Sequence, residues 1–456
     1  MREFVSVAMK TVRVKKGWRF KINGTPSPEI ENRLEVKHVA ATPSKIPFIK
    51  PRLLARSGDQ VKIGSPLFED KKNPGIKFLS PGSGKVVAVN YGPRRVIEEI
   101  IIALDADESC ETFETVDAKT LSRLDRKTLI LKLMAGGVWP FIRQLPYREI
   151  ANPELKPASI LVSLDSADPF QPSPEVCYNN QRSFFDMGVQ ALRKLAEHVN
   201  IIQSAKNRSI DWLNQLVTHQ VLGDYPANDP GVVLYHTRQS PADNHAWYIN
   251  GQDLLLIGEF LSTGLYPIQR IISFSDGTIE NSKHIKTRLG VKLNELYSSH
   301  ENMDHLRWIV GGVLSGYTSH ADGFLGMYET SVMVIEEAQK SELFGFARPG
   351  SDKLSNSRTV LSALSSAPLK VNSDMHGEER PCINCGYCAK ICPVDILPQF
   401  TYKSIYADEI EEALAHGLLD CVECGLCSFV CPSKIELSEL LIDAKHMYRR
   451  EINQGA

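Results

Sequence analysis

The sequence predicts a multidomain α+β protein that ends in a small helical module rich in cysteine. Three observations predict this organisation: the length of 456 residues, a change from short strands to longer apolar segments after about residue 110, and a cysteine pattern that occurs twice near the end. The length allows about three or four domains. Hydrophobic residues make up 43% of the chain and charged residues 23%, as in ordinary globular proteins. The formal net charge of −2 does not favour nucleic acid as a partner, and we expect none.

The N-terminal stretch MREFVSVAMKTVRVKKGWRF is interrupted by charged residues and therefore lacks the apolar core of a secretory signal. Elsewhere, no apolar run approaches the about 18 residues that a membrane-spanning helix needs. We therefore expect a cytosolic protein without a transmembrane segment of its own, in a compartment where thiols stay reduced. If the protein works at a membrane, another subunit must hold it there.

Residues 1–110 are predicted to contain an N-terminal segment and a barrel-sandwich domain like those of lipoyl and biotinyl carriers. Short β-rich pieces such as Lys85–Val89 and Val96–Leu104 alternate there with turns that contain Gly and Pro. The longer apolar segments that follow predict a different kind of domain.

Residues 111–240 are predicted to form an α/β domain. Ser159–Leu164 and Val199–Gln203 have the composition of buried strands, and Phe184–His198 between them has helical periodicity. This region contains no G-x-G-x-x-G pattern, so a nucleotide site cannot be argued from it.

Residues 241–335 are predicted to form a small β-grasp-like domain. Strands are expected at Trp247–Ile249, Leu254–Ile257 and Arg270–Phe274, and a helix is expected near Lys292–Leu296. A polar connecting segment, 336–375, then leads to the cysteine-rich module.

The module, residues 376–456, contains the runs CINCGYCAKICP and CVECGLCSFVCP, both of the form C-x₂-C-x₂-C-x₃-C-P. This is the ligand run of two-cluster ferredoxins, in which the cysteine before Pro binds the other cluster. The spacing therefore predicts two crossed [4Fe–4S] sites: a first with Cys382, Cys385, Cys388 and Cys431, and a second with Cys421, Cys424, Cys427 and Cys392. A disulfide framework and a pair of zinc sites are the alternatives, and the spacing favours neither.

The 28 residues between the two runs, 393–420, exceed the linker of small ferredoxins and indicate an all-helical module. Ser404–Leu418 has helical spacing, and a last helix is expected to begin near Ser433.

Two further sets of side chains could contact a ligand. Asp165 and Asp168 follow a predicted strand, where the carboxyl edge of an open sheet could bind one, although capping and turn formation are favoured. His300 and His305 flank an acidic turn, where exposed, solvated histidines are favoured over a metal site. No catalytic residue is identified.

Stretches throughout the chain resemble one family, the A subunits of the Na⁺-translocating NADH:quinone reductase. The matching stretches are VKKGWRFKING (14–24), GGVWPFIRQLPY (136–147), ILVSLDSADPFQPSPE (160–175), AWYINGQDLLLIGEFLSTGLYPIQRIISF (246–274), VGGVLSGYTSHADGFLGMYETSVMVI (310–335) and ELFGFARPGSDKLSNSRT (342–359). The chain is also similar to the C subunit of the Rnf electron-transport complex, which combines a barrel-sandwich, a flavoprotein-like α/β domain, a β-grasp and a two-cluster ferredoxin.

The sequence departs from each pattern in one respect. Familiar members of the first family have lost most cluster ligands, whereas this chain keeps all eight cysteines. Rnf C subunits carry a Gly-rich flavin and nucleotide loop, whereas the matching stretch here has only Gly136 and Gly137, followed by Trp139, Pro140 and Phe141. These bulky residues would fill the space where backbone must approach phosphate. We therefore expect that this chain binds neither FMN nor NADH and that its α/β domain is a degenerate flavoprotein-like domain.

The resemblance implies a peripheral subunit on the cytoplasmic face of the cell membrane. Such a subunit would contribute to quinone reduction by NADH coupled to Na⁺ export, its two clusters relaying electrons. Its partners would be the membrane and peripheral subunits of the same reductase, with quinone a candidate ligand reached through the complex, and the chain alone would not be active. One alternative is an Rnf-like electron-input subunit that oxidises NADH or ferredoxin with bound flavin. Another is a structural assembly subunit whose clusters only hold helices together.

Overall fold

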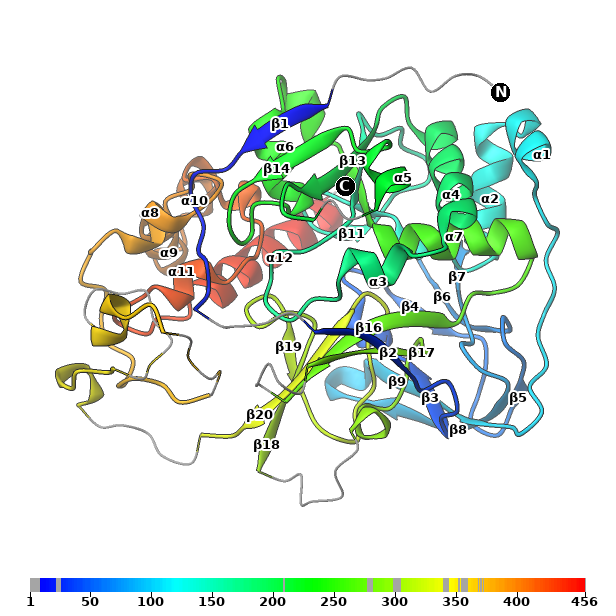
Figure 1. Cartoon of the computed structure of the whole chain (residues 1–456), viewed down its shortest axis with the longest axis horizontal. Coiled ribbons are helices and arrows are strands. Elements are labelled where there is room, and N and C mark those ends of the chain that lie inside the picture. Colours follow the sequence, from blue (N-terminus) through cyan, green and yellow to red (C-terminus); the bar gives the residue numbers. More distant parts are fainter. Residues whose placement is uncertain are drawn as a thin grey trace.

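The computed structural model describes residues 9–21, 26–207, 210–276, 282–297, 305–338, 344–351, 353, 360–367, 369, 371 and 373–455. Figure 1 shows the barrel-sandwich strands in blue at the lower right, the α/β domain in green above, a second sheet below its centre and the cysteine-rich helices in orange and red at the left. The predicted mixed α+β class is confirmed. Among these residues, no helix combines the length and the apolar character required to cross a bilayer.

The barrel-sandwich domain consists of two small antiparallel sheets. The first has the order β3-β9-β8-β5, with β3 His38–Ala41, β9 Ile97–Leu104, β8 Gly84–Tyr91 and β5 Gln60–Val61. The second has the order β4-β6-β7, with β4 Pro51–Leu53, β6 Pro66–Asp70 and β7 Asn73–Leu79. Two 3-10 turns, η1 Pro43–Lys45 and η2 Pro93–Arg95, connect strands. Alternate residues such as Ile100 and Ile102 of β9 are fully buried, which produces the core between the sheets.

The α/β domain is built on a seven-stranded sheet of order β1-β14-β13-β12-β15-β10-β11. Its parallel strands are β1 Lys10–Arg13, β14 His219–Leu222, β13 Val199–Ser204, β12 Ile160–Ser163 and β15 Trp247–Asn250. Two short antiparallel strands, β10 Arg143–Gln144 and β11 Glu149–Ile150, complete one edge. The predicted strands at 159–164 and 199–203 are confirmed.

The helices of this domain are α1 Ala118–Arg123, α2 Arg126–Ala135, α3 Pro174–Tyr178, α4 Arg182–Leu195, α5 Asp211–Asn214, α6 Pro230–Thr237 and α7 Gly251–Thr263, with 3-10 turns η3 Trp139–Phe141 and η4 Pro241–Asn244. Helices α4 and α7 pack so closely that there is no room for a side chain at Gly258 of α7. A Cβ there would come within 1.8 Å of the Phe184 carbonyl oxygen of α4. The predicted helix at 184–198 is confirmed as α4.

The sheet is buried on both faces, and different elements pack against each face. Ile160 and Val162 of β12 belong to the core that contains α4 and α7. Leu161, between them, belongs to a second core shared with α6 and with the cysteine-rich module, including Leu441. The continuous apolar run at this strand is explained by burial on both sides.

The prediction of a strand at Leu254–Ile257 is wrong, because these residues lie within helix α7. An all-apolar run of this length does not distinguish a buried strand from a buried helix. The predicted strand at Trp247–Ile249 exists as β15, but it pairs with β12 in the α/β sheet. A domain division at residue 240 would thus separate β15 and α7 from their sheet. The domain limits remain predictions, and a limit after α7 keeps the sheet intact.

The next sheet has six strands in the order β19-β18-β20-β16-β17-β2. They are β2 Ser27–Asn32, β16 Gln269–Ser275, β17 Lys283–Arg288, β18 Leu306–Val310, β19 Tyr317–Ser319 and β20 Ser331–Glu336. The predicted strand at 270–274 is confirmed as β16. The helix expected near Lys292–Leu296 is a single 3-10 turn, η5 Leu293–Leu296.

The N-terminal segment is divided between two sheets. Strand β1 pairs with β14 at the edge of the α/β sheet, and β2 pairs with β17 at the edge of the six-stranded sheet. The sequence groups both with the barrel-sandwich domain, since local pattern does not indicate which distant edge a strand will join.

The C-terminal module contains α8 Tyr387–Ile391, α9 Pro398–Tyr406, α10 Ile410–Ala415, α11 Leu426–Phe429 and α12 Leu437–Gly455, with the 3-10 turn η8 Leu418–Asp420. Two more 3-10 turns, η6 Gly345–Ala347 and η7 Leu361–Leu364, lie in the connecting segment. The expected helix at 404–418 is interrupted at Asp408, which has a φ of 56°.

Candidate iron–sulfur sites and the adjoining cavity

The two cysteine runs adopt the same local backbone. Asn384 and Gly386 of the first run have φ values of 54° and 72°, and Glu423 and Gly425 of the second have 59° and 75°. A short helix begins directly after each glycine, α8 in the first run and α11 in the second. The left-handed residues curl each run into a tight loop, so the repeated spacing produces a repeated structure.

The first group of thiols joins residues from both runs. Cys388 lies near Cys385 of its own run and near Cys431 of the other run, close enough for their charges to interact. Cys388 and Cys431 also belong to one buried core, together with Cys427 of the second run, and the partly buried Cys382 packs against it. The fourth cysteine of the second run thus lies near thiols of the first run.

The second group of thiols also joins residues from both runs. Cys392, from the first run, lies near Cys421. Cys424 lies near both of these residues, and Cys427 lies near all three. Cys427 also approaches Cys388 of the first group, so the two groups are adjacent.

The donor set suits iron–sulfur clusters better than single ions. All ten cysteines have free thiols, so no disulfide competes for them. Burial raises the pKa of Cys388 and of Cys392 to about 11, so thiolates would form here only with a cationic partner such as iron. No three His, Cys, Asp or Glu side chains within the described part of the chain converge on a single-ion site. In a four-iron cube each thiolate binds a different iron, so wider separations are expected.

The second group lies against two cations, the buried Lys445 and the partly buried Arg148. Lys445, fully buried, donates to the Cys421 carbonyl oxygen at 2.8 Å and to Glu423 Oε1 at 2.7 Å. Arg148 donates to the Val422 carbonyl oxygen and to Asp229, both at 2.9 Å. Burial opposes ionisation of Glu423, yet Lys445 and Arg148 hold its pKa below the ordinary value. The second run therefore sits in a compensated network of buried charges.

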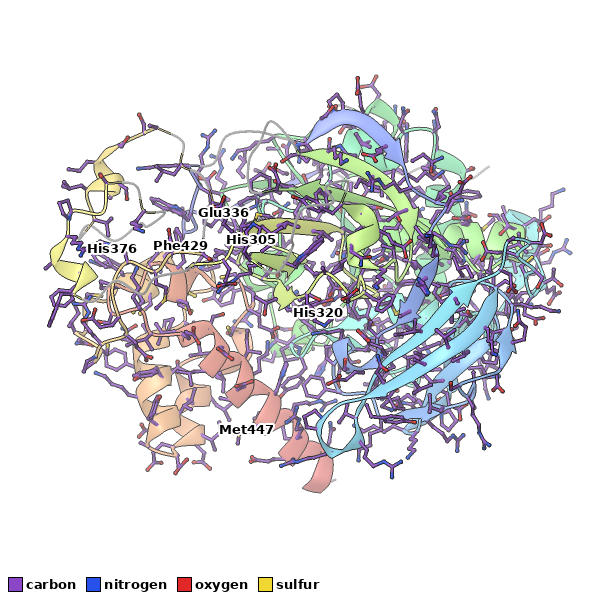
Figure 2. All side chains as sticks on the ribbon, turned by 90° about the horizontal axis from the view of Figure 1, so that it is seen from below. His305, His320, Glu336, His376, Phe429 and Met447 are labelled. Carbon is purple, nitrogen blue, oxygen red and sulfur yellow. The ribbon has the colours of Figure 1, made fainter. Side chains whose placement is uncertain are left out.

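The two groups differ in exposure. Cys382 and Cys385 of the first group are partly exposed, and Ile383 between them is 66% exposed. The second run instead docks on the α/β domain, where the Tyr225 hydroxyl donates to the Cys424 carbonyl oxygen at 2.8 Å. Figure 2 shows Phe429 on the side of the module that meets the connecting segment, and its ring lies 5.2 Å from that of Phe20.

A cavity of about 300 Å³ lies where the α/β domain, the six-stranded sheet and the second cysteine run meet. Its wall includes residues 163–166 after β12, residues 250–252 at the start of α7, residues 315–317 before and in β19, and residues 422–424. Five tyrosines and two arginines also line it: Tyr178, Tyr225, Tyr248, Tyr317, Tyr328, Arg143 and Arg148. The cavity thus reaches the backbone of the second cysteine run.

The two aspartates predicted at this sheet edge have different surroundings. Asp165 lines the cavity and accepts hydrogen bonds from Ser204, Asn207 and Asn228, so it orders the surrounding loops. Asp168 is 5% exposed and accepts a hydrogen bond from the Ser315 hydroxyl at 2.9 Å.

Replacing Asp168 with Asn is expected to weaken the pH dependence of stability. Burial raises the pKa of Asp168 to about 7, although the Ser315 hydroxyl and the Val313 amide lower it. Unfolded Asp titrates near pH 4, so between about pH 4 and pH 7 only the folded state retains this proton. The free energy of unfolding therefore falls as pH rises through that window, by up to about 4 kcal/mol.

Urea unfolding of the wild type and of Asp168→Asn at pH 5 and pH 8 measures this difference. The matched control is Asp107→Asn, because Asp107 is exposed. An equal pH dependence in the wild type and Asp168→Asn would contradict the prediction.

The other candidate residues lie apart from the thiols. His300 is outside the described residues, and His305 lies at the start of β18, near Glu336 of the paired strand (Figure 2). Trp139 and Phe141 are fully buried, and Trp139 Nε1 donates to the Ala151 carbonyl oxygen at 2.9 Å. These side chains belong to the core that contains α4 and α7.

Sequence reasoning missed the charged residues around the second thiol group. Lys445 offered a signal, because it adjoins the apolar stripe of the last helix and a lysine there should find a buried partner. Glu423 offered another, since it lies between two predicted ligands. Arg143 and Arg148 offered none, because their role depends on strands and loops brought together from distant parts of the chain.

Comparison with protein families gives three matches along the chain. Residues 12–105 match the NqrA N-terminal barrel-sandwich hybrid domain, residues 124–266 the NqrA second alpha/beta domain, and residues 381–435 a 4Fe-4S dicluster domain. The last match covers both cysteine runs. Among solved structures, an air-oxidised NAD⁺-reducing [NiFe]-hydrogenase aligns with 75% of this chain and 72% of its own at a TM-score of 0.34 and 12% identity, too low to establish a shared fold.

Curated relatives match over nearly the full length. The A subunit of the Na⁺-translocating NADH-quinone reductase of Vibrio vulnificus is 32% identical over 96% of this chain and 100% of its own length. The corresponding proteins of Actinobacillus pleuropneumoniae and Yersinia pestis are 31% and 32% identical, each over 90% of this chain and 92% of their own. The chain therefore belongs to the family of A subunits of the Na⁺-translocating NADH-quinone reductase, an oxidoreductase complex, and carries a 4Fe–4S dicluster domain at its C-terminus.

Proposed function

We propose that this chain is a peripheral subunit, on the cytoplasmic face of the cell membrane, of a reductase that couples quinone reduction by NADH to Na⁺ export. Its partners are the membrane and peripheral subunits of that complex, and quinone is reduced by the assembly. Two [4Fe–4S] clusters bound by the C-terminal module relay electrons within it. FMN and NADH are bound by other subunits.

One observation carries the cluster assignment: the fourth cysteine of each run lies beside the thiols of the other run. Cys382, Cys385, Cys388 and Cys431 form the first site, and Cys421, Cys424, Cys427 and Cys392 form the second. This exchange is the arrangement of two-cluster ferredoxins. The relay role rests on two further features, the adjacency of the groups through Cys427 and the partial exposure of the first.

The crossed arrangement makes a prediction that a simple one-run, one-cluster arrangement does not. In anaerobically purified full-length protein, Cys392→Ser and Cys421→Ser are expected to abolish the same EPR signal, and Cys388→Ser and Cys431→Ser the other, because each pair serves one cluster. Iron analysis should give about eight iron atoms per wild-type chain. The matched control is Cys110→Ser, since Cys110 is exposed and outside both runs. Loss of one signal by both Cys388→Ser and Cys392→Ser would contradict the crossing.

A second candidate function is structural, and the composition of the module core favours it: three of the five buried residues in one of its clusters are cysteines. Turnover of the assembled reductase distinguishes the two roles. A relay predicts that Cys385→Ser lowers NADH-driven quinone reduction even where the complex assembles normally. Unchanged turnover in an assembled complex that has lost the first cluster would support the structural role and exclude the relay.

A further inference from the structure

The cavity beside Cys424 lies at the switch point of the α/β sheet. From β12 the chain adds β13 and then β14 on one side, whereas β15 pairs on the other side of β12. Connections that leave two neighbouring parallel strands in opposite directions open a crevice at their carboxyl ends, where open α/β sheets bind ligands. Residues 163–166 and 250–252 at those ends line the cavity.

Arg143 contributes a cation to this cavity. Its guanidinium lies 4.6 Å from the centre of the Tyr248 ring and 4.3 Å from that of the Tyr328 ring. Its Nε is buried and forms no hydrogen bond with the described residues. Among those same residues, no carboxylate comes within ion-pair distance of its side chain. A guanidinium that lies against two aromatic rings and forms no ion pair retains unused hydrogen-bond donors.

Other unused donors converge on the same space. The Tyr248 hydroxyl, on a residue 1% exposed, lies beside Arg148 but makes no hydrogen bond of normal geometry within the described part of the chain. Helix α7, of 13 residues, begins at the cavity, and its N-cap residue Asn250 makes no side-chain capping bond. The first amides of a helix and its dipole attract negative charge. The Arg143 guanidinium, the Tyr248 hydroxyl and the N-terminus of α7 thus present hydrogen-bond donors to the same cavity.

The described carboxyl groups that line the cavity form no ion pair with Arg143. Asp229 and Glu423 are paired with Arg148, and Glu423 also with Lys445. Asp165 accepts hydrogen bonds from amide groups. Burial raises the pKa of Glu329, although the charges of Arg143 and Arg270 lower it. Of the two arginines that line the cavity, Arg148 is paired with carboxylates, whereas Arg143 forms no ion pair with the described residues.

From this arrangement we infer that the cavity binds an oxyanion, the phosphate or carboxylate group of a small ligand, held by Arg143, the Tyr248 hydroxyl and the N-terminus of α7, next to the second cluster site. The ligand would place negative charge beside Cys424. It would therefore lower the midpoint potential of the second cluster, since added negative charge disfavours reduction.

Titration of anaerobically purified full-length protein with inorganic phosphate and with succinate, followed by calorimetry and by EPR-monitored redox titration, tests this site. At least one probe is expected to bind and to lower the potential of the second cluster. Arg143→Gln is expected to weaken that binding about tenfold or more, and Tyr248→Phe to weaken it less. Arg143-dependent binding of phosphate alone identifies a phosphate-bearing ligand, whereas Arg143-dependent binding of succinate alone identifies a carboxylate ligand.

The matched control is Arg95→Gln, because Arg95 also lies over a tyrosine ring, that of Tyr91 at 6.0 Å, but in the barrel-sandwich domain. This variant is expected to bind the probe as the wild type does. Three results would overturn the inference: binding of none of the probes, equal binding by Arg143→Gln, or binding that leaves the second cluster potential unchanged. Since the Arg143 side chain contacts its surroundings mainly through two aromatic rings, Arg143→Gln should fold normally, and far-UV circular dichroism verifies this.

Discussion

Removal of iron is expected to unfold the core shared by the two thiol groups while the sheets remain folded. This core consists of Cys388 and Cys431 of the first group, Cys427 of the second group, Ile435 and Leu437, and the adjoining helices α8 and α11 are short. Isolated helices of this length are unstable in water, so the metal must hold them. Structural metal sites contribute on the order of 10 kcal/mol to folding. We expect the free energy of opening of α8 and α11 to fall by more than about 5 kcal/mol.

Hydrogen exchange before and after anaerobic treatment with an iron chelator measures this change. Amides of α8, α9 and α11 should lose protection. The internal control is the pair β12 and β13, which lie in the α/β sheet and share one core with α4 and α7. Helix α12 is expected to lose less protection than α11, because Leu441 and Ala444 pack in the core shared with the α/β domain. Unchanged protection of α8 and α11 in iron-free protein would contradict a stabilising role of the clusters.

Lys445→Met is expected to destabilise the protein by about 3–5 kcal/mol, the usual cost of removing one partner of a buried ion pair. The substitution removes the hydrogen bonds to Cys421 and Glu423 and leaves Glu423 with Arg148, whose Nε is 3.8 Å away. The pKa of Glu423 should then rise, since Lys445 and Arg148 hold it down against the effect of burial. Loss of the cation should also lower the potential of the second cluster.

Guanidinium unfolding and EPR-monitored redox titration measure the two effects. The matched control is Lys403→Met, an exposed lysine of α9 in the same module, which should change stability by less than about 0.5 kcal/mol. The double variant Lys445→Met/Glu423→Met should be more stable than Lys445→Met alone, because it also removes the carboxylate left without its lysine. A double variant no more stable than the single one would show that the lysine acts through packing alone.

The parts of the fold that follow from local pattern could be predicted. Gly and Pro turns between short β-rich pieces predict the barrel-sandwich, and periodicity predicts α4 and the strands β12 and β13. The run at 254–257 resembles a strand because α7 is apolar on nearly all sides. Its packing against α4, β12 and β15 explains that composition, and no local signal in the sequence reports such packing.

The positions of β1 and β2 had no local signal either. Each strand completes the edge of a sheet whose other strands come from residues more distant in sequence, β14 for the first and β17 for the second. A strand pattern indicates that a segment will pair, but the partner is set by the geometry of the folded edges.

The ligand chemistry of the candidate cluster sites can be read from the amino-acid sequence alone. Thiolate spacing and the left-handed residues between the cysteines act over a few bonds, so both cysteine runs could be interpreted without the fold. Their surroundings depend on the folded chain: Lys445 and Arg148 beside the second group, the hydroxyl of Tyr225 on Cys424, and Arg143 in the adjoining cavity. The physical reason is the sequence distance over which each effect acts. Ligand spacing depends on residues a few positions apart, whereas burial and charge compensation depend on distant segments that folding brings together.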